Sequence, residues 1–209
     1  STAPPLRHHL TVSRRDLIRL AAVPLVVVAT RSTSMAGSFE VIDDFTLPAP
    51  SAKNGASWQL VSDRVMGGVS RGTMARETIA GRNAPRMRGT VSLENNGGFI
   101  QVALNLSPDG APIDASSFTG IEIDVLGNGE MYNLHLRTAD LSRPWQSYRH
   151  SFAAGKDWET HQLPFANFDA HRISVPLAPA KLRRIGLVAI GRAFEADLAI
   201  GGIRFYKRS

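Results

Sequence analysis

The chain has 209 residues with a formal net charge of +6, 43% hydrophobic residues, 18 glycines and 12 prolines. This composition is typical of a folded domain rich in turns, and a chain of this length buries most of its apolar surface. Because the sequence contains no cysteine, it excludes disulfides, thiolate catalysis and cysteine-ligated metals.

The first 36 residues predict a targeting segment. Arg14 and Arg15 precede the apolar run 20–29, and Ser34-Met35-Ala36 is typical of a cleavage site between small residues. This order is that of a secretory signal, and the paired arginines favour the twin-arginine type. We expect cleavage after Ala36 and a periplasmic or otherwise exported mature chain, with a mitochondrial presequence as the alternative.

The apolar run is about half the length that a spanning helix needs, so we expect no stable transmembrane span.

Residues 1–36 carry five arginines and one acid, Asp16, and therefore four of the six net positive charges. The rest of the chain is close to neutral and has no basic run interleaved with aromatic residues. We therefore expect no binding of nucleic acid.

From residue 39 onward apolar and polar residues alternate, which predicts half-buried β-strands. Within 87–93 the pattern places Met87, Val91 and Leu93 inward, and 99–106 buries four aliphatic side chains. Residues 121–125 alternate three aliphatic residues with two acids, which we expect to face water.

The later strands follow the same period. Residues 132–137 place Asn133, His135 and Arg137 on the face opposite Tyr132 and two leucines. The last strands are expected near 182–190 and 198–206, where Gly201-Gly202 predicts a bulge.

Clusters of turn residues separate these strands. Asn95-Asn96-Gly97-Gly98 predicts a tight hairpin, because Asn and Gly both tolerate positive φ. No stretch after residue 37 sustains a long amphipathic helix. Many short antiparallel strands in one block predict an all-β sandwich or barrel, with residues 37–209 as one domain.

Two strings, SDRVMGGVS at 62–70 and GTVSLENNGGF at 89–99, resemble the complex I intermediate-associated protein 30 (CIA30) family. Trp58, Tyr148 and the stretch 158–165 extend the resemblance over nearly all of residues 39–206. The resemblance implies a jelly-roll β-sandwich similar to galactose-binding domains. Because mitochondrial members of the family are assembly factors for respiratory complex I, it also implies a non-catalytic binding or chaperone role.

The two strings supply most candidate partner-binding residues. Adjacent glycines let the backbone turn sharply or approach another surface closely, so Asp63 and Arg64 beside exposed amides can grip a polar group. The structural alternative is a glycine bulge with Asp63 capping a turn. Because loops cluster at the ends of sandwiches, we hypothesise that both strings share one end. The candidates are Asp63, Arg64, Met66, Gly67, Gly68, Ser70, Glu94, Asn95 and Asn96.

Further candidates lie elsewhere in the sequence. Arg137 belongs to the polar stripe with Asn133 and His135, for which a solvated sheet face is the alternative. Trp145, Tyr148 and Trp158 are candidates for a carbohydrate platform, since flat rings cover sugar faces, with core packing as the alternative.

No motif predicts catalysis. The six histidines form no HExxH pattern, and Ser70 lacks the GxSxG context, so we expect no cofactor and no catalytic metal. A structural calcium held by loop oxygens stays open. The favoured function is non-catalytic binding of a protein partner, such as a subunit of a membrane or respiratory complex. A carbohydrate-binding module ranks second, and a glycan hydrolase using Glu122 and Asp124 ranks last.

Overall fold

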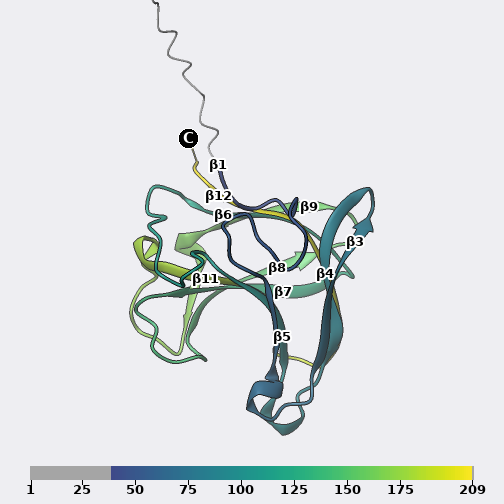
Figure 1. Cartoon of the computed structure of the whole chain (residues 1–209). Helices are drawn as coiled ribbons and strands as arrows, with labels where there is room; N and C mark the ends of the chain where they lie inside the picture. Colours follow the sequence, from purple (N-terminus) through teal and green to yellow (C-terminus); the bar gives the residue numbers. More distant parts are fainter. Residues whose placement is uncertain (1–38, 209) are drawn as a thin grey trace, which may run out of the picture. The chain divides into compact units, whose positions relative to one another are not determined.

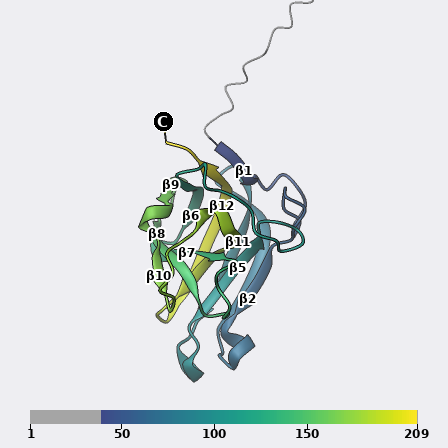
Figure 2. The same ribbon diagram turned by 90° about the vertical axis from the view of Figure 1, so that its left-hand side faces the viewer.

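The computed structural model describes residues 39–208, and the predicted signal segment, residues 1–36, lies outside the described residues. The described strands form two antiparallel sheets that lie face to face (Figures 1 and 2). The predicted all-β sandwich is therefore confirmed. Within residues 39–208 no helix has the length and apolar character that crossing a membrane requires.

The first sheet, here called the β12 sheet, has the order β3-β4-β12-β6-β9, with β1 also paired to β12. Its strands are β1 (Phe39–Asp43), β3 (Arg71–Ile79), β4 (Arg82–Val91), β6 (Gly120–Gly127), β9 (Glu159–Pro164) and β12 (Phe194–Tyr206).

The second sheet, here called the β11 sheet, has the order β10-β8-β7-β11-β5-β2. Its strands are β2 (Gln59–Ser62), β5 (Phe99–Asn105), β7 (Glu130–Thr138), β8 (Ser147–Ala154), β10 (Asp169–His171) and β11 (Leu182–Ile190). Short 3-10 helices occupy connections: η1 (Asp63–Met66), η2 (Glu94–Asn96), η3 (Phe165–Asn167) and η4 (Pro179–Lys181).

The core lies between the sheets and follows the two-residue period of the sequence. Ile121 and Ile123 of β6 are fully buried, as are Leu134 of β7 and Ile185 of β11. Burying one such aliphatic side chain contributes about 1.5–3 kcal/mol. The bulge predicted at Gly201-Gly202 is present, because the register between β12 and β6 shifts between Ile200 and Gly202.

The predicted hairpin at Asn95-Asn96-Gly97-Gly98 is wrong. β4 belongs to the β12 sheet and β5 to the β11 sheet, so this segment carries the chain from one sheet to the other. Alternation ends with β4 at Val91, and Leu93, predicted to face inward, is 51% exposed. A tight hairpin instead joins β3 and β4, where Ala80 and Gly81 both have positive φ.

Candidate functional site

The strings at 62–70 and 92–98 lie together at one end of β5, where their loops project beyond the strands (Figure 1). We call these residues the loop cluster. Asp63 lies at its centre and is fully buried. Its carboxylate accepts hydrogen bonds from the backbone N–H and hydroxyl of Ser70 at 2.9 and 2.5 Å. It also accepts one from the backbone N–H of Gly98 at 2.6 Å. One carboxylate therefore ties both strings together.

One glycine of each adjacent pair is required by this packing. A Cβ on Gly68 would lie 2.3 Å from Cγ of Asp63, and a Cβ on Gly97 would lie 2.4 Å from Oδ2 of Asp63. Two further bonds close the cluster, because Ser92 N–H donates to the Ser70 hydroxyl and the Asn95 amide donates to the Gly67 carbonyl. The loops thus have little freedom to rearrange around Asp63.

The electrostatics of Asp63 agree with this role. Burial alone would raise the pKa of its carboxyl, but the hydrogen bonds from Ser70 and Gly98 outweigh burial and leave the pKa below its usual value. Asp63 and Ser70 are therefore charged or polar groups already satisfied inside the cluster. They position the loops. Although the sequence made both residues candidates for binding a partner, their side chains are not available to one.

The loop cluster exposes several apolar side chains. Val65 and Met66 of η1 are 76% and 63% exposed, and Leu93 before η2 is 51% exposed. The same loops also expose Arg64, Glu94, Asn95 and Asn96. Val69 is also 39% exposed, so the loop cluster presents four apolar side chains to the surroundings among exposed polar residues.

A second candidate surface is the outer face of the β11 sheet, which carries the predicted polar stripe. Arg149, His135 and Gly186 lie side by side across β8, β7 and β11. Burial, with smaller contributions from Arg149 and His171, lowers the pKa of His135 to about 3, so its imidazole is neutral at neutral pH. Among the described residues, no partner lies within hydrogen-bonding distance of its buried Nε2.

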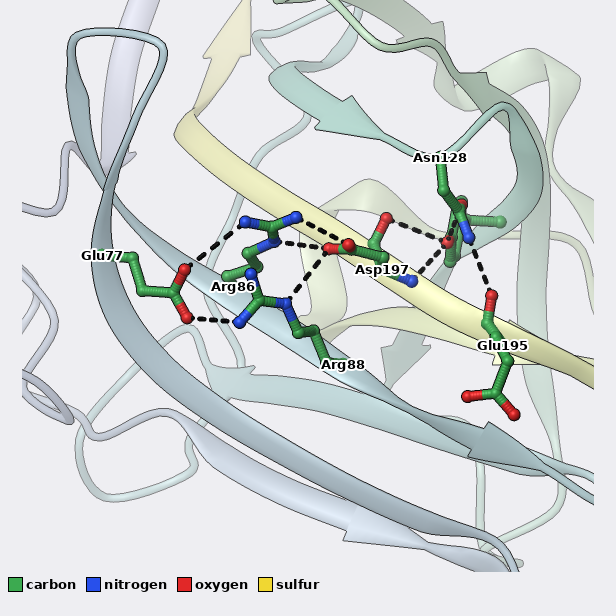
Figure 3. Close-up of polar contacts among 7 residues, drawn as sticks. Glu77, Arg86, Arg88, Asn128, Glu195 and Asp197 are labelled. Atoms are coloured by element: carbon green, nitrogen blue, oxygen red, sulfur yellow. Dashed lines mark hydrogen bonds and ion pairs between the residues drawn. The ribbon is translucent and has the colours of Figure 1, made fainter.

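The outer face of the β12 sheet differs because its charges are paired (Figure 3). The guanidinium of Arg86 lies between Asp197, at 2.5 and 2.6 Å, and Glu77, at 3.4 Å. Arg88 bonds the other oxygen of Glu77 at 2.7 Å.

The two acids of the hydrolase hypothesis lie on the same face. Arg204 binds both Glu122 and Asp124, and Glu122, predicted to face water, is only 5% exposed beneath it. Gln162 and Thr160 donate further hydrogen bonds to these carboxylates. Their geometry is that of a structural ion-pair network. No cluster of three His, Asp or Glu side chains arranged to hold a metal occurs within the described part of the chain.

The three candidate aromatic residues have different environments. Tyr148 is fully buried and donates its hydroxyl hydrogen bond to the carbonyl of Val175, so it belongs to the core. Trp158 is half-buried, donates to the carbonyl of Ile79 and lies beneath Arg82. Trp145 is 53% exposed, in the loop between β7 and β8. The guanidinium of Arg137 holds this loop by donating to the carbonyls of Arg143, Pro144 and Gln146.

Sequence reasoning missed several surface residues. Val65 and Leu93 belong to the family-like segments 62–70 and 89–99, but their exposure follows from the fold of the loop cluster and not from any local sequence pattern. Arg183 and Arg184 were visible as a pair at the start of a strand, but strict alternation would send them to opposite faces. The register between β11 and β7 shifts between Leu182 and Arg184, and this irregularity brings both arginines to one pocket.

The architecture places the chain among β-sandwich proteins with the fold of carbohydrate-binding modules. The family 11 module of a cellulosomal cellulase of Clostridium thermocellum superposes with a TM-score of 0.65 at 14% identity, over 81% of this chain and 95% of the module. The same family 11 module in complex with a mixed-linked tetrasaccharide gives 0.63 at 15% identity, over 81% and 95%. A family 30 module gives 0.53 at 15% identity, over 81% and 99%.

At this level of identity the likeness concerns the fold alone. Residues 44–200 match the family described as Complex I intermediate-associated protein 30 (CIA30), and the chain belongs to that family. Comparison with curated proteins found no match.

Proposed function

We propose that this protein is a non-catalytic binding protein that holds a protein partner through the loop cluster. The observation that carries the proposal is the exposure of Val65, Met66 and Leu93 on loops that the buried Asp63 makes rigid. Exposed aliphatic groups on a preorganised backbone favour association, because little conformational freedom is lost on binding. Apolar anchors within a polar border are also typical of protein interfaces.

The chemistry of the cluster favours a protein over a sugar. Sugars are bound by flat aromatic rings and by polar groups directed at hydroxyls, whereas the exposed apolar residues of the loop cluster are not aromatic and the carboxylate of Asp63 is enclosed. The CIA30 description supports a partner within a respiratory complex. The twin-arginine-type segment supports an exported protein that meets a membrane complex at the outer side of the membrane.

Affinity capture from detergent-solubilised membranes of the source organism tests the proposal. Wild-type protein should enrich subunits of one membrane complex, and Val65→Glu combined with Met66→Glu should abolish the enrichment. Leu47→Glu is the matched control, since Leu47 is 41% exposed outside the loop cluster. Enrichment that survives the double substitution, or that Leu47→Glu removes equally, would contradict the proposed surface.

Carbohydrate binding is the second candidate, and the exposed Trp145 is the observation that favours it. Its ring stands on a loop that Arg137 fixes beside the outer face of the β11 sheet. The carbohydrate-binding modules that share the fold add support. Glycan-array binding that disappears in Trp145→Ala but persists in Met66→Glu would establish this function in place of the first.

A further inference from the structure

A cavity of about 210 Å³ opens at the end of β5 away from the loop cluster. Arg137 of β7 and Arg183 and Arg184 of β11 line it, with Asn105 at the end of β5 and Gly110 beyond it. Ligand cavities for drug-sized molecules are usually about 300–1,000 Å³. The cavity therefore suits a small chemical group better than a whole extended ligand.

Neutral oxygens hold the three guanidinium groups in place. Arg184 donates to the side-chain oxygens of Asn105 and Gln59 at 3.0 and 3.1 Å. Arg183 donates through Nε to the carbonyl of Gly110 at 2.8 Å. Arg137 donates through Nη1 to three loop carbonyls at 2.6–3.0 Å. These bonds orient the cations. Further N–H groups, such as those on Nη2 of Arg137, donate no hydrogen bond to the described residues.

Carboxylates do not neutralise this cluster. Within residues 39–208, no Asp or Glu oxygen lies within 4.0 Å of Arg137, Arg183 or Arg184. The nearest acids along the chain are engaged elsewhere: Asp140 pairs with Lys181 at 2.9 Å, and Asp109 accepts hydrogen bonds from Ser107 and Ala111.

The positive charges of Arg183 and Arg184 repel that of Arg137. Burial lowers the pKa of Arg137, and the neighbouring charges of Arg184 and Arg183 lower it further. Burial likewise lowers the pKa of Arg184. Because a guanidinium stays protonated in proteins, deprotonation does not relieve this repulsion. A counter-charge inside the cavity would relieve it directly.

From this geometry we propose that the cavity between Arg137, Arg183 and Arg184 is a binding site for an oxyanion, either a carboxylate or a phosphate group of a small ligand. The planar fork of a guanidinium matches both groups with paired, charge-assisted hydrogen bonds. The site is separate from the loop cluster, since the seven residues of β5 lie between them. It stands whether or not the proposed partner binding is correct.

Calorimetric titration of the purified protein at low ionic strength tests the site with three probes: inorganic phosphate, D-glucuronate and, as the uncharged comparison, D-glucose. Titration to about 10 mM detects dissociation constants near 1 mM. We expect saturable binding of phosphate, glucuronate or both, with one site per chain, and none of glucose. Binding of phosphate alone identifies a phosphate ligand, and binding of glucuronate alone identifies the carboxylate of a sugar acid.

Variants locate the site. Arg184→Gln and Arg183→Gln should each weaken binding at least about ten-fold, since each removes charge-assisted hydrogen bonds. Arg184→Lys keeps the charge without the fork and should give an intermediate affinity. Arg88→Gln removes the same charge from the β12 sheet and should bind as wild type does.

Amide chemical-shift changes on isotopically labelled protein give a readout that does not depend on a variant folding. They should gather at residues 105–110, 137–138 and 183–184. No saturable binding of either anion, shifts elsewhere, or equal weakening by Arg88→Gln would overturn the proposal.

Discussion

Replacing Asp63 with Asn tests the central role of one buried carboxylate in the loop cluster. The amide keeps one oxygen, which can still face the Ser70 hydroxyl and the Gly98 amide, but its NH₂ group then faces the backbone N–H of Ser70. A buried donor without an acceptor costs about 1–3 kcal/mol, and two charge-assisted bonds become neutral at about 1 kcal/mol each. We therefore expect the free energy of unfolding to fall by about 3–5 kcal/mol.

Urea unfolding followed by circular dichroism measures this loss directly. In a domain of this size, the melting temperature should fall by roughly 6–20 °C. Asp109→Asn is the matched control, because Asp109 is exposed and bonds only local groups, so its effect should stay within about 0.5 kcal/mol. Unchanged unfolding of Asp63→Asn, together with unchanged hydrogen exchange at the Gly98 amide, would refute this account of the cluster.

Three further predictions concern stability. Because folding lowers the pKa of Asp63, the ionised carboxylate stabilises the fold fully above the unfolded pKa of about 3.9, and this stabilisation is lost as pH falls through the folded pKa. Urea unfolding from neutral to acid pH should show this loss of stability. The Asp63→Asn variant should lack the part of the loss that Asp63 causes. Arg204→Met leaves Glu122 and Asp124 without their guanidinium partner and should lower the free energy of unfolding by about 2 kcal/mol, after allowance for partial exposure. A melting temperature equal to that of wild type would contradict a stabilising ion-pair network. Gly89→Ala places a Cβ 2.0 Å from the carbonyl oxygen of Arg71 and should cost at least about 2 kcal/mol in denaturant unfolding, which an unshifted midpoint would disprove.

The fold was predictable where the signal is local. Alternation within one strand depends only on which side chains share a sheet face, and the burial of β7 follows it. In β6 the aliphatic positions are buried as predicted, but Glu122 between them is buried as well. Sheet membership depends on which strands pair over long distances, and the turn chemistry of Asn95-Asn96-Gly97-Gly98 carries no such information. The same residues with positive φ that suit a hairpin also suit a loop that crosses between sheets.

The candidate site shows the same division. The glycine pairs marked 62–70 and 89–99 as unusual, but the reason is the carboxylate of Asp63, which would lie 2.4 Å from a Cβ on Gly68 or on Gly97. The approach to Gly97 in the second string depends on the pairing of β2 with β5. Likewise, the adjacent cations Arg183 and Arg184 line one cavity because of a register shift that the alternating pattern does not encode.

The two outer faces separate charges that stabilise the fold from charges that do not. On the β12 sheet, Arg86 and Arg204 each contact two carboxylates, so Coulomb attraction offsets the loss of hydration. On the β11 sheet, Arg137 and Arg184 lose hydration and gain only neutral oxygen acceptors. Folding alone therefore gives no reason to keep these two guanidinium groups together. Binding of a negatively charged ligand gives such a reason, because the ligand would provide the Coulomb attraction that no carboxylate of the described residues provides.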